Sequence, residues 1–137
     1  MNIKSLLISG LVTGLVIMTS ALTMVPVVGN QMDAVLASRG LPPLSNIAMI
    51  FFCFVSLITG IILIWLYAVL KNYYGAGIKT VIIVSVFVWF IGNFLSSMAL
   101  IAYGFMPVKL TVIGTIWGFF ETLIASIIGT RFYKDKK

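Results

Sequence analysis

The sequence predicts an all-α, polytopic membrane protein: a bundle of four antiparallel transmembrane helices. Four apolar runs, at about 6–28, 46–70, 80–105 and 110–130, are each long enough to cross roughly 30 Å of hydrocarbon. Hydrophobic residues make up 61% of the 137 residues and charged residues 9%, which leaves no room for a soluble domain. Such uniformly apolar runs favour helices over barrel strands. We therefore expect residues 1–137 to form a single transmembrane domain in the lipid bilayer.

The first apolar run follows Lys4, which is the charge order of a secretory signal peptide. The run is longer than the 7 to 15 apolar residues that are usual in such peptides. We therefore expect it to be retained as the first transmembrane helix.

Basic residues predict the orientation, because Lys and Arg in short loops stay on the cytoplasmic side. Four spans put both termini on one side, and that side carries seven of the nine basic residues. These are Lys4, Lys71, Lys79, Arg131, Lys134, Lys136 and Lys137. The other side has Arg39 and Lys109, so we expect both termini to be cytoplasmic. Topology and anionic headgroups explain the net charge of +6, and nucleic-acid binding is not expected.

The segment between the first two runs has helix signals of its own. Asn30 is a suitable N-cap, and Gly40 before two prolines is a stop signal. Three apolar residues between them share one helical face: Met32, Val35 and Leu36. We expect a short interfacial helix on the outer membrane surface, and a plain connecting loop is the alternative.

Aromatic residues cluster around the second loop and are typical anchors at a membrane interface. The cluster comprises Trp65, Tyr67, Tyr73 and Tyr74. The loop also contains Gly75 and Gly77 before Lys79, a pattern that matches neither the P-loop nor the dinucleotide fingerprint. Nucleotide binding is therefore not expected.

Small residues predict where the helices pack, because in lipid a close backbone approach takes over the role of the hydrophobic effect. The first run contains Gly10 and Gly14, four residues apart. The last run has a longer ladder at the same spacing: Gly114, Gly118, Thr122 and Ser126. This ladder predicts a packing seam, against a helix of this chain or of another subunit.

Glu121 is the only charged residue inside any of the four runs, and it lies near the middle of the last one. Asn93 lies at a similar depth on the neighbouring run, and Thr59 and Ser56 lie in the middle of the second. We expect Glu121 to face inward, to hydrogen-bond Asn93, and to be mostly protonated, because no basic residue lies at its depth. These four residues are the predicted polar core.

Three interpretations of this polar core stay open at the level of sequence. The Glu–Asn pair can hold helices together without any chemistry. It can also form part of a solute or proton pathway, or contact a bound lipid, quinone or pigment. An ionisable residue inside a membrane is by default a candidate for function, so none of the three is discarded.

The residues that the chain lacks argue against catalysis. There is no His to ligate a metal or haem, and one Cys, Cys53, can form no internal disulfide. Asp33 and Asp135 lie outside the hydrocarbon, so Glu121 has no second carboxylate beside it. We predict no catalytic residues, no metal site and no cofactor, and a protein that is not an enzyme.

Two stretches, WLYAVLKNYYGAGIKTVIIVSVFVWFIGNF and IWGFFETLIASIIGTRFYK, resemble an uncharacterised family of small four-helix bacterial inner-membrane proteins. The shared pattern is Trp-Leu-Tyr, a Gly-x-Gly-x-Lys-Thr loop and a Trp-Gly-x-x-Glu helix. Matching positions are Trp65, Leu66, Tyr67, Tyr74, Gly75, Gly77, Lys79, Thr80, Trp89, Trp117, Gly118, Glu121, Gly129 and Tyr133. Lys71 and Asn72 stand where that family is richer in Arg and Pro. The resemblance covers about half of the chain and implies a bacterial inner membrane, without a mechanism.

Two functions follow as hypotheses. The first is a non-catalytic accessory or assembly subunit of a larger membrane complex, which fits the very short loops and the small-residue seam. The second is a small oligomeric carrier or channel with a site at Glu121 and Asn93 near the middle of the membrane.

Overall fold

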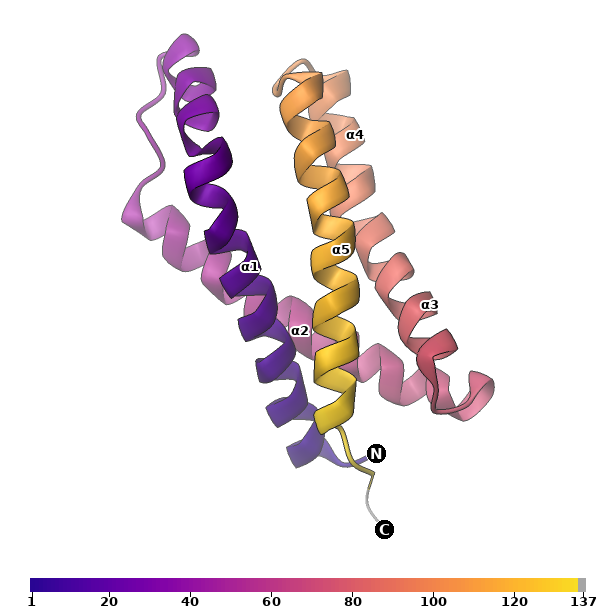
Figure 1. Cartoon of the computed structure of the whole chain (residues 1–137). Helices are drawn as coiled ribbons and strands as arrows, with labels where there is room; N and C mark the ends of the chain where they lie inside the picture. Colours follow the sequence, from indigo (N-terminus) through magenta and orange to yellow (C-terminus); the bar gives the residue numbers. More distant parts are fainter. Residues whose placement is uncertain (136–137) are drawn as a thin grey trace.

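The structure is a computed structural model that describes residues 1–135 as helices joined by short loops (Figure 1). The elements are α1 (Ile3–Ser38), α2 (Asn46–Tyr74), α3 (Ile78–Trp89), the π-helix η1 (Phe90–Phe94), α4 (Leu95–Ala102) and α5 (Val108–Phe132). α3, η1 and α4 run on as one helical rod, so the described residues contain four helices long and apolar enough to span a membrane. The predicted all-α fold with four spans is confirmed, and the chain is a multi-pass membrane protein by helix length and hydropathy.

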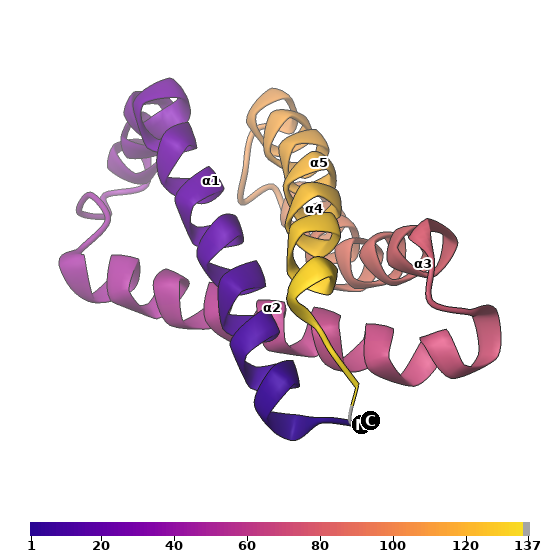
Figure 2. The same cartoon turned by 60° about the horizontal axis from the view of Figure 1, so that its bottom comes forward.

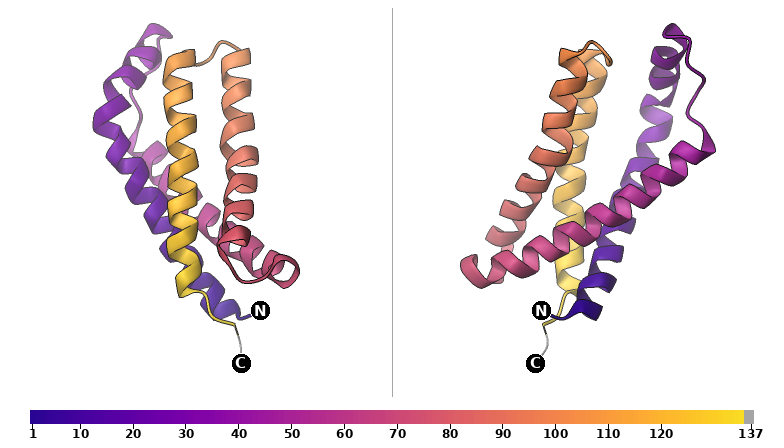
Figure 3. Two further views of the ribbon diagram at one scale, coloured as in Figure 1. Left: turned by 45° about the vertical axis from the view of Figure 1, so that its right-hand side comes forward. Right: turned by 180° about the vertical axis from the view of Figure 1, so that it is seen from behind.

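The four spans form an antiparallel bundle, with both termini at the same end (Figure 1). α1 packs against α2 and α5, and α3 packs against α5 and α2. α2 crosses the other helices obliquely (Figure 2); it lies behind them in the view of Figure 1 and in front of them in the right-hand view of Figure 3. Away from the termini, α1 diverges from the pair formed by α4 and α5 (Figure 3).

Local sequence signals set the helix ends. The side chain of Asn2 accepts a hydrogen bond from the backbone N–H of Ser5 in the first turn of α1, at 3.3 Å. The side chain of Ser45 accepts one from the backbone N–H of Ala48 in the first turn of α2, at 3.2 Å. Gly40 and Gly104 have φ of 69°, a left-handed conformation that favours glycine. Gly40 donates to the carbonyl of Ala37, and the next N–H donates to the carbonyl of Leu36, both at 3.0 Å, which is a Schellman motif.

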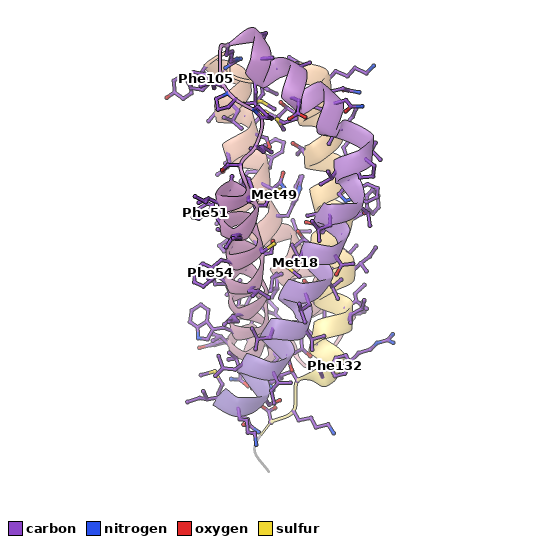
Figure 4. All side chains as sticks on the ribbon, turned by 90° about the vertical axis from the view of Figure 1, so that its left-hand side faces the viewer. Met18, Met49, Phe51, Phe54, Phe105 and Phe132 are labelled. Atoms are coloured by element: carbon purple, nitrogen blue, oxygen red, sulfur yellow. The ribbon has the colours of Figure 1, made fainter. Side chains whose placement is uncertain are left out.

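The predicted short interfacial helix between the first two spans is wrong as a separate element. Its residues, from Asn30 to Leu36, are the last turns of α1, which continues to Ser38. Pro26 lies inside α1, where its ring removes one hydrogen bond and favours a kink without ending the helix. Figure 4 shows α1 turning over toward its far end. The stop predicted at Gly40 is where the helix does end.

The helices are packed tightly in one half of the molecule and loosely in the other. We call the end near the termini the packed half; it holds the buried residues of α1 up to Ile17, those of α2 from Gly60 onward, and those of α3. The remainder of α1 and α2, together with η1 and α4, has no buried residue among those described and forms the open half. The packed half therefore contains the hydrophobic core. Its residues are Leu6, Ile17, Leu63, Ile64, Tyr67, Ala68, Val81, Val84, Ala125 and Tyr133.

The outward faces of the helices are apolar and suit contact with acyl chains. Phe51 and Phe54 of α2 point away from the bundle (Figure 4). Phe51 is 62% exposed and Phe54 is 60% exposed. A soluble protein would not expose so many large apolar side chains. Contact with a lipid bilayer follows from these faces and from the four membrane-length helices.

Glycines bring α1 and α2 into backbone contact. A Cβ atom on Gly10 would lie 2.7 Å from the Cα of Ile61, and one on Gly14 would lie 2.6 Å from the Cα of Leu57. The facing glycine on α2 is Gly60, where a Cβ would lie 2.6 Å from the Cα of Gly14. Gly60 was not predicted as a packing residue, although Ser56, another small residue, stands four positions before it.

The predicted ladder on α5 divides into two parts. Thr122 and Ser126 are buried and donate their hydroxyls to carbonyls four residues earlier, both at 2.7 Å. Gly118 packs against Asn93, since a Cβ there would lie 3.0 Å from the amide carbon. Gly114 is exposed and has nothing within 4 Å of a built Cβ, so this end of the ladder packs against no helix within the described chain.

We predict that Gly60→Val lowers the free energy of unfolding in detergent by about 1–3 kcal/mol, because the added methyl groups force α1 and α2 apart. Unfolding followed by circular dichroism during SDS titration measures the change. Gly114→Ala is the matched control and should be neutral or slightly stabilising. Equal stability of wild type and Gly60→Val would contradict the close crossing.

Candidate functional site

A cavity of about 470 Å³ opens between α2, η1 and α5, and the four predicted polar-core residues all line it. Ser56 and Thr59 come from α2, Asn93 comes from η1, and Glu121 comes from α5. We call this space the polar cavity. It lies at the level where the packed half passes into the open half.

The π-helix places Asn93 in the cavity wall. The N–H of Leu95 donates to the carbonyl of Phe90, five residues back, so the helix accommodates one extra residue in this turn. Ser97 donates its hydroxyl to Oδ1 of Asn93 at 3.5 Å, which is a long hydrogen bond. Sequence reasoning missed this turn, although π-helical turns are frequent at functional sites and Gly92 stands within it.

Glu121 is half-buried and lines a small pocket together with Ser20 of α1. The indole of Trp117 donates to the same Ser20 hydroxyl at 3.2 Å. The expected hydrogen bond to Asn93 is not formed: within residues 1–135, the two side chains share the cavity without bonding each other. The small pocket has a volume of about 270 Å³ and lies between α1 and α5, so the carboxyl of Glu121 is accessible from two sides.

The hydroxyl groups of Ser56 and Thr59 at the cavity already donate hydrogen bonds to the backbone. Ser56 and Thr59 donate to the carbonyls of Phe52 and Val55, each at 2.9 Å, so their free lone pairs are left to accept. The amide of Asn93 supplies N–H donors, and Glu121 supplies a carboxyl. No basic residue of the described chain lines this cavity. The arrangement offers hydrogen bonds and one site for a proton or a positive charge.

Aromatic rings form part of the cavity wall. Trp89 is held in place because its indole N–H donates to the carbonyl of Thr115 at 2.9 Å and its ring packs edge-on against Phe119, with ring centroids 5.2 Å apart. Trp65 and Phe87 also line the cavity and are exposed on its open side. Trp65 was predicted as an interface anchor, and the structure also places it at this wall.

The other predicted anchors occupy two environments. Tyr73 and Tyr74 are exposed, as expected for residues at an interface. Tyr67 is 8% exposed and belongs to the core, where its ring packs edge-on against Tyr133. Tyr67 lies on the face of α2 that packs against the other helices, so its predicted role as an anchor is corrected to core packing.

The chain termini are joined by a polar cluster that sequence reasoning did not find. Lys71, with 10% of its side chain exposed, forms an ion pair with Asp135 and lies 4.5 Å from the ring centroid of Tyr133. The hydroxyl of Tyr133 donates to Asp135 at 3.1 Å, and the N–H of Lys134 donates to the hydroxyl of Ser5 at 2.7 Å. The cluster ties the end of α5 to α2 and α1. Lys136 and Lys137, counted in the orientation argument, lie outside the described residues.

The part of the chain that the structure describes contains no group of three or more His, Cys, Asp or Glu residues that could hold a metal ion. Comparisons of this chain with protein-family models, with curated proteins and with solved structures give no match. The site is therefore interpreted from its own residues.

We predict that the terminal cluster makes stability depend on pH. The hydrogen bond from Lys71, with a further one from Tyr133, holds the pKa of Asp135 below its usual range. A carboxyl whose pKa is lowered by folding stabilises the fold above its unfolded pKa, and this stabilisation is lost as the pH falls through the folded value. The melting temperature of wild type should therefore fall at acid pH, and Asp135→Asn should melt lower at neutral pH and respond less to acid.

Asp33→Asn is the matched control, because Asp33 is an acid outside this cluster. Its melting temperature should follow the wild-type pH profile. Identical profiles for wild type and Asp135→Asn in detergent would show that the ion pair makes no contribution.

Proposed function

We propose that this protein is a non-catalytic accessory or assembly subunit of a larger complex in the bacterial inner membrane, with both termini in the cytoplasm. The observation that carries the proposal is the open half, in which three of the four spans have no buried residue among those described. Among the described spans, only α5 has buried residues in this half, Leu110, Thr111 and Thr115, so the other three spans present helix surfaces to other helices. The basic bias at the termini and the family resemblance support the membrane and the orientation.

A groove between the far part of α1 and the pair α4 and α5 has room for side chains of a partner transmembrane helix. We call it the partner groove; it has a volume of about 250 Å³, and its lining includes Met24, Val28, Met32, Leu100, Met106, Leu110 and Gly114. Three of these residues are methionines, whose flexible side chains adapt to an incoming surface. The groove is mostly apolar, with Asn93, Ser97 and Thr111 as its polar residues, and its methionines make it adaptable to a helix surface in lipid.

Gly114 gives the groove a place for close backbone approach. It is the end of the small-residue ladder that packs against nothing in the described chain. Within lipid, small residues at an interface allow helices to approach closely enough for van der Waals packing. The predicted seam thus has one end inside this protein and one end available to a second subunit.

Arg39 bridges the rim of this groove. Its guanidinium donates to the carbonyl of Gly104 at 2.6 Å and lies 5.7 Å from the ring centroid of Phe105. The bridge connects the end of α1 with the loop between α4 and α5. A partner helix would therefore reach the groove laterally, through the bilayer.

Photocrosslinking in the native membrane tests this proposal. A photoreactive amino acid at Val28 or Leu100, in the partner groove, should give discrete protein adducts. The same amino acid at Ile8 or Ile82, exposed on the packed half, should give lipid adducts only. Mass spectrometry identifies the products. Protein adducts of equal yield at all four positions, or at none, would contradict a specific partner at the groove.

A second candidate function is a small oligomeric carrier or channel. The observation that favours it is the position of Glu121, which lines pockets on two sides of α5 together with polar groups from α2 and η1. Four helices enclose little space, so a pathway across the membrane would need a symmetric partner copy.

Proton flux into liposomes tests this second function. If Glu121 carries protons, Glu121→Gln should reduce the flux at least about tenfold, because the amide cannot release a proton. Glu121→Asp is the matched control and should retain part of the flux. A wild-type rate equal to that of empty liposomes would remove this candidate.

A further inference from the structure

We propose that the polar cavity binds a lipophilic organic cation, with its positive charge beside the carboxylate of Glu121 and its apolar groups against the aromatic wall. The inference concerns binding and requires neither transport nor a partner subunit. The partner groove lies on the other side of Asn93, so the two sites can be tested separately.

Glu121, the one ionisable residue among residues 1–135 that lines the cavity, determines which sign of charge a ligand can carry. Glu121 is an acid without a basic counterpart: among described residues, the groups that face it are hydroxyls, an amide and an indole. They are Ser20 on α1, Ser56 and Thr59 on α2, Asn93 on η1, and Trp117 and Thr122 on α5. A carboxylate in a low-dielectric site with no cation beside it favours a cation and disfavours an anion.

The walls of the cavity select the kind of cation. Trp65, Phe87 and Trp89 present aromatic rings, which attract organic cations through the negative face of the ring. The remaining wall is mostly aliphatic, and a volume of about 470 Å³ suits a small organic molecule. A bare metal ion needs several oxygen ligands at short range, and a single carboxylate with scattered hydroxyls in a space of this size does not provide them.

Proton exchange keeps the charge balanced. When the cavity is empty, the Glu121 carboxyl holds a proton, since nothing at its depth compensates a negative charge. When the cation enters, that proton leaves to water and the carboxylate pairs with the ligand. One proton is therefore released for each cation bound. A neutral ligand such as a quinone would use the hydrogen bonds of Asn93 and would release no proton.

Tetraphenylphosphonium is the probe, added to full-length protein in phosphatidylcholine nanodiscs and followed by calorimetry in buffers of different ionisation enthalpy. We expect saturable binding with one proton released per cation. Glu121→Gln should weaken binding at least about tenfold, as expected for loss of the charge partner, while Glu121→Asp should keep most of it. Asp33→Asn is the matched control, because Asp33 lines a different pocket near the start of α2, and it should bind like wild type.

Several outcomes would overturn the proposal. Triphenylphosphine oxide, a neutral analogue, should bind to wild type more weakly than the cation does. Equal binding of the two would assign the cavity to neutral ligands. Binding that Asp33→Asn abolishes and Glu121→Gln retains would move the site elsewhere. No saturable signal from wild-type protein above that of empty nanodiscs would show that there is no site. Equal melting temperatures of wild type and Glu121→Gln show that weaker binding by the variant is not caused by unfolding.

Discussion

The close crossing of α1 and α2 is the contact on which the rest of the structure depends. Gly10 and Gly14 on one helix meet Gly60 on the other at backbone distance, and side chains at these positions would separate the helices. In lipid such van der Waals contact takes the place of hydrophobic burial as the force that joins helices. α5 then joins the same half, since Gly129 lies directly against Thr13 of α1. Because α2 crosses obliquely, helices that touch here must diverge farther along, and the open half follows from the tightness of the packed half.

The polar cavity owes its position to that divergence. Near the termini the space between helices is filled by core side chains such as Leu63, Ile64 and Val84. One or two turns farther along, the gap exceeds what the side chains fill, and polar groups from α2, η1 and α5 border it. Glu121 is thus sheltered by protein and still accessible. A parallel arrangement of the same helices would have closed the cavity, and the carboxyl would then have served packing alone.

The sequence predicted the spans well because a run of apolar residues has one stable form in lipid. It predicted the four cavity residues as a group for a related reason, since polar residues at one depth of antiparallel neighbours tend to meet. It failed where the outcome depends on a balance of contacts. Pro26 stands inside α1 without ending it, and the contact of Gly60 with Gly10 and Gly14 depends on how α1 and α2 cross. The π-turn around Asn93 and the ion pair of Lys71 with Asp135 depend on tertiary neighbours, which no local pattern records.

Asn93 connects the two sites that we propose. Its side chain lines the polar cavity on one side and the partner groove on the other. It also stands in the π-helix, where one extra residue is held in the turn by a backbone bond that can revert to the α pattern. A helix seated in the groove and a ligand in the cavity would therefore contact the same amide from opposite sides. Where the two ligands require different orientations of this amide, each changes the affinity of the other, and linkage makes the two factors equal.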